Sequence, residues 1–182
     1  MLTELKKLSQ ETAVYGLSTV VGRVLNFLLL PLYTYYLAPA EYGIVATLFS
    51  YLAFLNILYG HGLDFAFMRH FDSQSEERTE ACFSTTFWSL TTTSLLISGS
   101  MHIFAGSIST ACGIASGLSD LTRYAAWILA FDTMALVPFA YLRMTHRAST
   151  YAAVKVINIV MNLTLNFIFV AKLDMGGRGV FL

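Results

Sequence analysis

Arg23 is the residue whose type and position most directly suggest chemistry, because it lies in the middle of a long apolar stretch. The stretch from residue 12 to residue 37 contains no other charged residue. As a helix it would extend about 39 Å, enough to cross a bilayer with some tilt. A charge at that depth costs about 2.5–3.5 kcal/mol on insertion scales, so it usually faces a protein interior or a watery cavity. Arg23 is therefore a candidate anion contact.

The same stretch carries a polar stripe, whose members recur at intervals of four, four and three residues: Tyr15, Thr19, Arg23 and Asn26. This spacing places all four on one face of a helix, which makes Asn26 a candidate cavity residue beside Arg23. Gly16 and Gly22 flank the stripe and would allow close approach by a neighbouring helix or a ligand. A stripe that only packs against other helices is the alternative.

Two intramembrane carboxylates are candidates for ion coupling. In the apolar segment 42–68, Asn56, Gly60 and Asp64 are spaced by four and four residues. We therefore expect Asn56 and Asp64 to share a cavity face. Asp64 is alternatively a partner for Arg23 or a group near the helix end that reaches for water. Asp132 lies near the centre of the apolar segment 121–142, where a carboxylate must be either protonated or paired. A neutral, hydrogen-bonded Asp132 facing another helix explains its position equally well.

The apolar segment 151–171 has one lysine and three amides on one helix face. They are spaced by three, four and four residues: Lys155, Asn158, Asn162 and Asn166. Three Asn on one face favour an interior position, and Asn158 and Asn162 are candidates to contact sugar hydroxyls. Helix–helix hydrogen bonds alone are the alternative. For the many Ser and Thr of the third segment, we expect bonds to their own helix or to neighbouring helices.

The composition indicates which elements must position these residues. The chain has 182 residues, of which 56% are hydrophobic and only 12% are charged, against about 25% charged residues in soluble domains. The sequence therefore predicts an all-α membrane protein, a bundle of about five transmembrane helices that takes up residues 1–182. The expected spans cover residues 12–37, 42–68, 81–107, 121–142 and 151–171.

Several classes of function are disfavoured by the same sequence. The formal net charge is zero, which does not suggest a nucleic-acid partner. Cys82 and Cys112 lack metal or redox spacing. No nucleophile elbow, phosphate-binding loop, zinc-ligand spacing or dinucleotide fingerprint occurs. We therefore expect neither enzymatic activity nor a cofactor or metal.

The distribution of basic residues predicts the orientation in the cytoplasmic (inner) membrane. With the N-terminus in the cytoplasm, seven Lys and Arg fall inside and three fall outside, as the positive-inside rule requires. The inner residues are Lys6, Lys7, Arg69, Arg78, Arg143, Arg147 and Lys155, and the outer ones are Arg123, Lys172 and Arg178. We therefore expect a multi-pass protein with a cytoplasmic N-terminus.

Short motifs occur in an order that resembles one family of transporters, the polysaccharide-type (Wzx-like) flippases of the multidrug/oligosaccharidyl-lipid/polysaccharide exporter superfamily. These motifs are YGL at 15–17, LPLYTYYL at 30–37, EYG at 41–43, GLDFAFMR at 62–69, YLR at 141–143, RASTY at 147–151 and GRGV at 177–180. The resemblance covers nearly the whole chain. It implies most of one lobe of a two-lobed MOP-type flippase, since family members usually have twelve to fourteen spanning helices.

The resemblance also implies a function and partners. The substrate would be a polyprenyl-pyrophosphate-linked oligosaccharide, moved between the leaflets by alternating access, with membrane lipids and polysaccharide assembly proteins as partners. Arg23 would meet the pyrophosphate and the Asn faces would meet the sugar. Two alternatives stay open. One is a cation-coupled multidrug exporter of the same superfamily, with Asp64 or Asp132 as the coupling carboxylate. The other is a truncated, non-transporting membrane protein, because the second lobe is missing from these residues.

Overall fold

The computed structural model describes residues 2–111, 113, 119–173 and 175–181, with the side chains of residues 2–11, 26 and 28 outside the description. All elements in these ranges are helical. They are α1 (Leu2–Tyr36), α2 (Pro39–Gly60), α3 (Leu63–His70), α4 (Glu76–Ile103), α5 (Ala105–Ala111), α6 (Ser119–Met144), α7 (Ala148–Asn166), the π-helical segment η2 (Phe167–Lys172) and the 3-10 turn η3 (Gly176–Val180).

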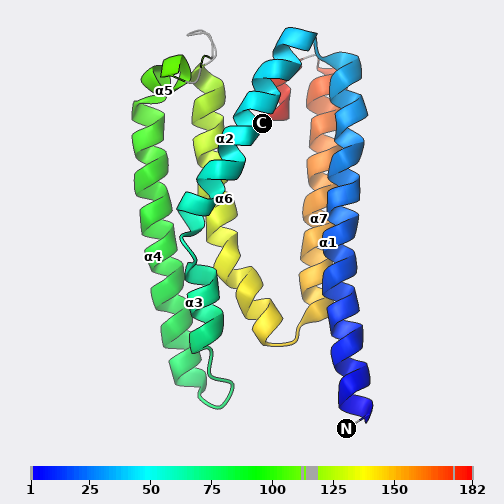
Figure 1. The fold of residues 1–182 in the computed structure, drawn as a ribbon, viewed down its shortest axis with the longest axis vertical. Coiled ribbons are helices and arrows are strands. Elements are labelled where there is room, and N and C mark those ends of the chain that lie inside the picture. Colours follow the sequence, from blue (N-terminus) through cyan, green and yellow to red (C-terminus); the bar gives the residue numbers. More distant parts are fainter. Residues whose placement is uncertain (1, 112, 114–118, 174, 182) are drawn as a thin grey trace.

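The helices form two groups (Figure 1). In one group α4 runs beside α6, and α3 packs against both of them. In the other group α1 and α7 run side by side in the same direction. Helix α2 starts beside the end of α1 and crosses obliquely to α4 and α6, while η3 packs against α2.

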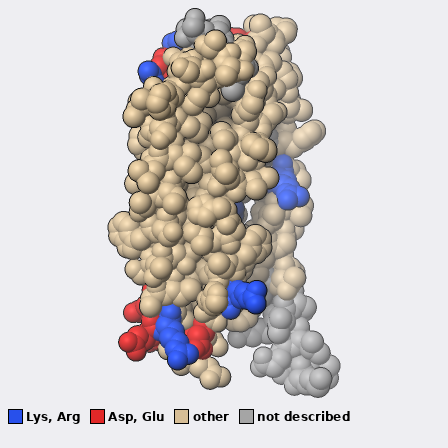
Figure 2. All heavy atoms as spheres, turned by 60° about the vertical axis from the view of Figure 1, so that its left-hand side comes forward, with Lys and Arg blue, Asp and Glu red and all other residues tan. Residues whose placement is uncertain are grey.

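The expected all-α membrane bundle is confirmed. Within the described residues, four segments are long and apolar enough to cross a membrane: Thr12–Tyr36, Pro39–His70, Ser119–Met144 and Ala148–Lys172. Figure 2 shows a face with few charged side chains, where Lys, Arg, Asp and Glu gather mainly at the two ends. The remaining expected span, 81–107, corresponds to α4 and part of α5. At 28 residues α4 is long enough to cross, but its many hydroxyl side chains lower its hydropathy.

The second span is interrupted, and the expected register of its polar residues is wrong. Helix α2 ends at Gly60, after which His61 and Gly62 have positive φ angles of 28° and 75°. Gly62 adopts this conformation without a steric penalty because it has no Cβ. Asp64 then lies in the first turn of a new helix, α3. The spacing of four and four from Asn56 therefore does not place Asp64 on the face of α2 that carries Asn56.

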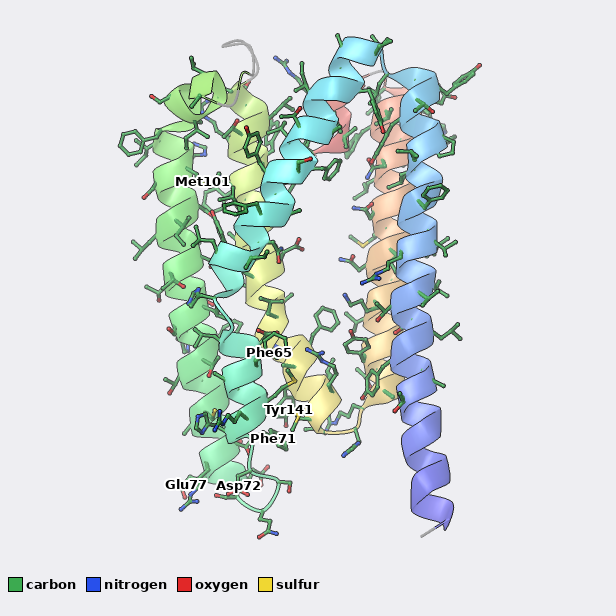
Figure 3. The ribbon with its side chains drawn as sticks, in the orientation of Figure 1. Phe65, Phe71, Asp72, Glu77, Met101 and Tyr141 are labelled. Carbon is green, nitrogen blue, oxygen red and sulfur yellow. The ribbon has the colours of Figure 1, made fainter. Side chains whose placement is uncertain are left out.

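An aromatic cluster holds α3, α4 and α6 together at the end where the α3–α4 loop lies. Phe67 is fully buried and packs edge-on against Phe71 and Phe83, with ring centroids 6.0 Å apart in both pairs. Tyr141 of α6 contacts both partners, at 6.5 Å from Phe71 and 5.5 Å from Phe83. Figure 3 shows Phe71 and Tyr141 near one another, close to the loop that carries Asp72. These contacts fix the α3–α4–α6 group as one side of the bundle.

The α1–α7 pair depends on a small residue. Ile159 of α7 is buried, and a Cβ atom at Gly22 would lie 3.1 Å from its Cδ1 atom. The close approach expected at Gly22 is thus a helix–helix contact, as small residues commonly allow in membranes. At Gly16 a Cβ atom would meet no described atom within 4 Å. Only Gly22 of the two glycines is therefore required for this packing.

We expect the substitution Gly22→Leu to separate α1 from α7 and to lower the thermal unfolding temperature of the purified protein. Overpacking at a close contact costs about 1–3 kcal/mol. The matched variant Gly16→Leu, on the same helix, should unfold at the wild-type temperature. Equal unfolding temperatures for the two variants would contradict the Gly22–Ile159 contact.

Candidate functional site: a polar cavity in the bundle

A cavity of about 630 Å³ lies between the two groups of helices. This volume is in the range of small-molecule sites, which measure about 300–1,000 Å³. Most of its wall is apolar and comes from α1, α2, α6, α7, η2 and η3. Six polar side chains interrupt that wall: Tyr33, Tyr42, Asp132, Asn158, Asn162 and Asn166. An apolar pocket with a few convergent polar groups is the usual form of a binding site.

Helix α7 supplies the amides of this cavity because of their spacing. Asn158, Asn162 and Asn166 are four residues apart and so occupy one helix face, and all three line the cavity. Ile157 and Val160, which lie elsewhere around α7, are exposed apolar residues suited to lipid or to another protein surface. The sequence of α7 therefore separates a polar inner face from an apolar outer face.

A short hydrogen-bond network joins the amides to α1. The Tyr33 hydroxyl donates to Asn166 Oδ1 at 2.6 Å, and both residues are buried. Asn166 Nδ2 in turn donates to the backbone carbonyl oxygen of Asn162 at 3.0 Å and to its Oδ1 at 3.3 Å. Asn166 thus forms a helix–helix hydrogen bond, which was the alternative explanation for the Asn face. Asn158 is exposed and makes no hydrogen bond to the described residues, so its amide is available to a ligand.

Asp132 contributes a carboxylate to the cavity from α6, where its side chain is exposed. The ammonium group of Lys155 is near enough for a Coulombic interaction with this carboxylate. Its Nζ lies 4.9 Å from the centre of the Phe139 ring. Among the described side chains, Asp132 has no Lys or Arg nitrogen within 4 Å. Asp132 is therefore a charged group of the cavity wall, and the Lys155 ammonium group lies near it without belonging to the lining.

Arg23 lies close to the cavity but not in its described lining. Its side chain is exposed on α1. Phe27 and Leu30, which do line the cavity, follow it by four and seven residues and so lie on the same helix face, within about 40° of it. The described side chains include no ion pair between Arg23 and Asp64. The side chain of Asn26 is outside the described residues.

The other predicted residues lie apart from this cavity. Asn56 is exposed on α2, and Asp64 is half-buried on α3; neither is part of the cavity lining. The structure therefore brings together Asp132, Asn158 and Asn162 of the candidate residues. Among the described residues, no three His, Cys, Asp or Glu side chains are grouped so that they could hold a metal ion.

Tyr33 and Tyr42 are polar site residues that the sequence reasoning missed, and only Tyr33 lies on α1. Tyr33 could have been found from the polar stripe of that helix. It follows Asn26 by seven residues, so it continues the polar stripe of α1 for another two turns. Extending the stripe past Pro31 would have found it, because α1 continues as a helix through Pro31 to Tyr36. Chemically, the assembled groups can donate and accept hydrogen bonds with a neutral polar ligand and can attract a charged group.

We expect the substitution Tyr33→Phe to destabilise the protein by about 1–3 kcal/mol, because it leaves the buried Asn166 Oδ1 atom without its donor. Thermal unfolding of the purified protein would measure the loss. Tyr35→Phe is the control, because Tyr35 is 82% exposed. If both variants unfold at the same temperature, the Tyr33–Asn166 bond does not stabilise the α1–α7 pair.

A known protein family matches most of the chain. The model of the family described as polysaccharide biosynthesis protein matches residues 35–178. This range includes the α6 and α7 residues of the cavity, Asp132, Asn158 and Asn162. No curated protein and no solved structure gives a significant match. With its apolar helices and its matched range, the chain belongs to the polysaccharide biosynthesis protein family.

Proposed function

We propose that this protein translocates a polyprenyl-pyrophosphate-linked oligosaccharide across the cytoplasmic membrane by alternating access. The observation that carries the proposal is the polar cavity inside an apolar bundle. Membership of the polysaccharide biosynthesis protein family supports a glycan substrate, and the apolar helices suit one that is carried on a membrane lipid. The resemblance of the sequence motifs to Wzx-like flippases supports the same function.

The cavity residues suit an oligosaccharide. The amides of Asn158 and Asn162 offer both donors and acceptors to sugar hydroxyls. The rings of Phe27 and Phe49 also line the cavity and offer apolar surface to the C–H faces of a sugar. A single hydrogen bond contributes about 0.5–1.5 kcal/mol net, so several weak contacts allow both binding and release.

Arg23 is the proposed contact for the pyrophosphate. A guanidinium binds phosphate oxygens with two parallel hydrogen bonds. Its place on the face of α1 that continues into the cavity lining is consistent with this role. Oligosaccharide and pyrophosphate would then be bound by neighbouring parts of the bundle. The polyprenyl chain would stay among the membrane lipids, and polysaccharide assembly proteins would act on the product.

The charges at the ends of the bundle favour a cytoplasmic N-terminus. Arg69, Arg78, Arg143 and Arg147 lie in or beside the α3–α4 and α6–α7 connections, which are at the same end as the N-terminus (Figure 1). Arg123, Lys172 and Arg178 belong to elements at the other end. The positive-inside rule places the more basic end in the cytoplasm. The substrate would therefore enter from the inner leaflet, where the N-terminal end lies.

We expect the substitution Asn158→Ala to reduce export of surface polysaccharide by about tenfold, because a site with a missing hydrogen-bonding partner binds the sugar less well. The change would be made in the gene, and export would be measured in cells. Val160→Ala is the control, because Val160 is an exposed apolar residue of the same helix at a similar depth. Normal export by the Asn158 variant, with accumulation unchanged, would contradict the proposed sugar contact.

A second candidate function is cation-coupled export of small molecules, and the position of Asp132 in the cavity favours it. In that case Asp132→Asn would abolish proton- or sodium-driven efflux of a cationic dye from cells, since the carboxylate that binds the cation is lost. Asp120→Asn is the control, because Asp120 is paired with Arg123 at 3.1 Å at the start of α6. Dye efflux that does not depend on a cation gradient would exclude this function.

A further inference from the structure

We propose that Lys155, one helical turn from the cavity residue Asn158, receives the anionic group of the substrate. The proposal rests on the proposed function and adds a residue to it. The shared chemistry is that of an oxyanion, which can be the pyrophosphate of the lipid or the carboxylate of an acidic sugar. Lys155 would form ion pairs and hydrogen bonds with it through its three N–H donors.

The position of Lys155 on α7 connects it to the cavity. It precedes the cavity residue Asn158 by three residues and so lies one turn away on nearly the same face. It follows Ala148, where α7 begins, by seven residues, which corresponds to about 10 Å along the helix. Lys155 therefore lies in the first half of α7, toward the end of the bundle where the α6–α7 connection lies. A lipid pyrophosphate entering from this end would meet Lys155 before the amides.

Lys155 is held in place by a ring and has no carboxylate in direct contact. It is half-buried, whereas a lysine that only extended to the membrane surface would be exposed. Its Nζ lies 4.9 Å from the centre of the Phe139 ring, and the ring covers only one side of the ammonium group. Among the described residues, no Asp or Glu oxygen lies within 4 Å of it. The Asp132 carboxylate interacts with this ammonium group only at longer range, so the lysine N–H donors form no ion pair with a described carboxylate and can serve an anion.

Two edge-on contacts among three aromatic rings fix Phe139, and Phe139 in turn positions Lys155. Phe139 of α6 packs edge-on against Tyr151 of α7 at 5.3 Å. Tyr151 packs edge-on against Tyr15 of α1 at 5.0 Å. These ring contacts thus join α1, α6 and α7 near the end of the bundle where the α6–α7 connection lies. Lys155 is held at the junction of the two helix groups, where a change in their relative position would move it.

The pairing of α1 with α7 places a second cation, Arg23, close to the level of Lys155 along the bundle axis. Gly22 contacts Ile159, so Arg23 lies beside that contact and Lys155 lies one turn before it. Since α1 and α7 run in the same direction, the two cations differ by about 7.5 Å along the bundle. A pyrophosphate carries two phosphoryl groups, and two cations on adjoining helices suit it. Asp132, on the cavity wall, would repel the anion and so limit how deep it goes.

The test measures binding by the purified 182-residue protein in lipid nanodiscs. Three probes are compared: geranylgeranyl diphosphate, the uncharged alcohol geranylgeraniol, and a soluble glucuronic-acid-containing tetrasaccharide. We expect Lys155→Met to bind the diphosphate at least tenfold more weakly than the wild type, with binding of the alcohol unchanged. Lys155→Arg, which keeps the charge, should bind within about threefold of the wild type. Arg23→Met should weaken diphosphate binding as well.

Controls separate this role from a structural one. Lys172→Met removes an exposed lysine at the far end of η2 and should leave all three affinities unchanged. Lys155→Gln is a second neutral variant in case Lys155→Met does not fold, as judged by its unfolding temperature. Loss of tetrasaccharide binding in place of diphosphate binding would identify the sugar carboxylate as the anion.

The outcomes distinguish the two proposals. If the wild type binds the diphosphate and the neutral Lys155 variants bind it equally well, Lys155 is not the anion contact, while the proposed function stands. If the wild type binds neither the diphosphate nor the tetrasaccharide, the proposed function fails, and the role of Lys155 fails with it.

Discussion

The hydrocarbon core of a bilayer offers no hydrogen-bond partner, so every polar group in a membrane span must be satisfied by the protein or by trapped water. The helical backbone meets this requirement within each segment. The side chains meet it in two ways. Many hydroxyls bond to the preceding turn of their own helix, as Thr47 does to Gly43 O at 2.8 Å and Thr133 does to Leu129 O at 2.7 Å. Others join helices, as Ser98 of α4 does by donating to Ala126 O of α6 at 2.7 Å.

The polar groups of the cavity differ from these hydroxyls because only some of them are satisfied inside the protein. Asn166 is bonded to Tyr33 and to Asn162 and stabilises the α1–α7 pair. Asn158 and Asp132 lie further along the cavity and are exposed to it. One end of the Asn face is thus structural, and the other end is open to water or a ligand. Leaving these groups unsatisfied in a membrane is costly, which is a physical reason to connect them with binding.

Part of the cavity wall comes from a segment without a regular α-helix. At the end of α7 the helix widens into the π-helical η2, and the glycine-rich η3 follows. A Cβ atom at Gly179 would lie 3.1 Å from the backbone of Phe169, so a side chain here would force the returning chain to shift. Phe181 then stacks on Phe49 of α2 at 5.3 Å, and both rings line the cavity. π-helical segments are frequent at functional sites.

The class of the protein and the amide face of α7 can be predicted from single segments of the sequence. Apolar segments of sufficient length require a membrane, and the spacing of Asn158, Asn162 and Asn166 requires a shared face, since both follow from the geometry of one helix. Which helix faces meet depends instead on packing between segments that are distant in sequence. The break at His61–Gly62 removes Asp64 from the expected register, and the Gly22–Ile159 contact pairs α1 with α7. The packing of helices distant in sequence makes Asp132 a neighbour of the Asn residues, and no periodicity within one helix specifies that packing.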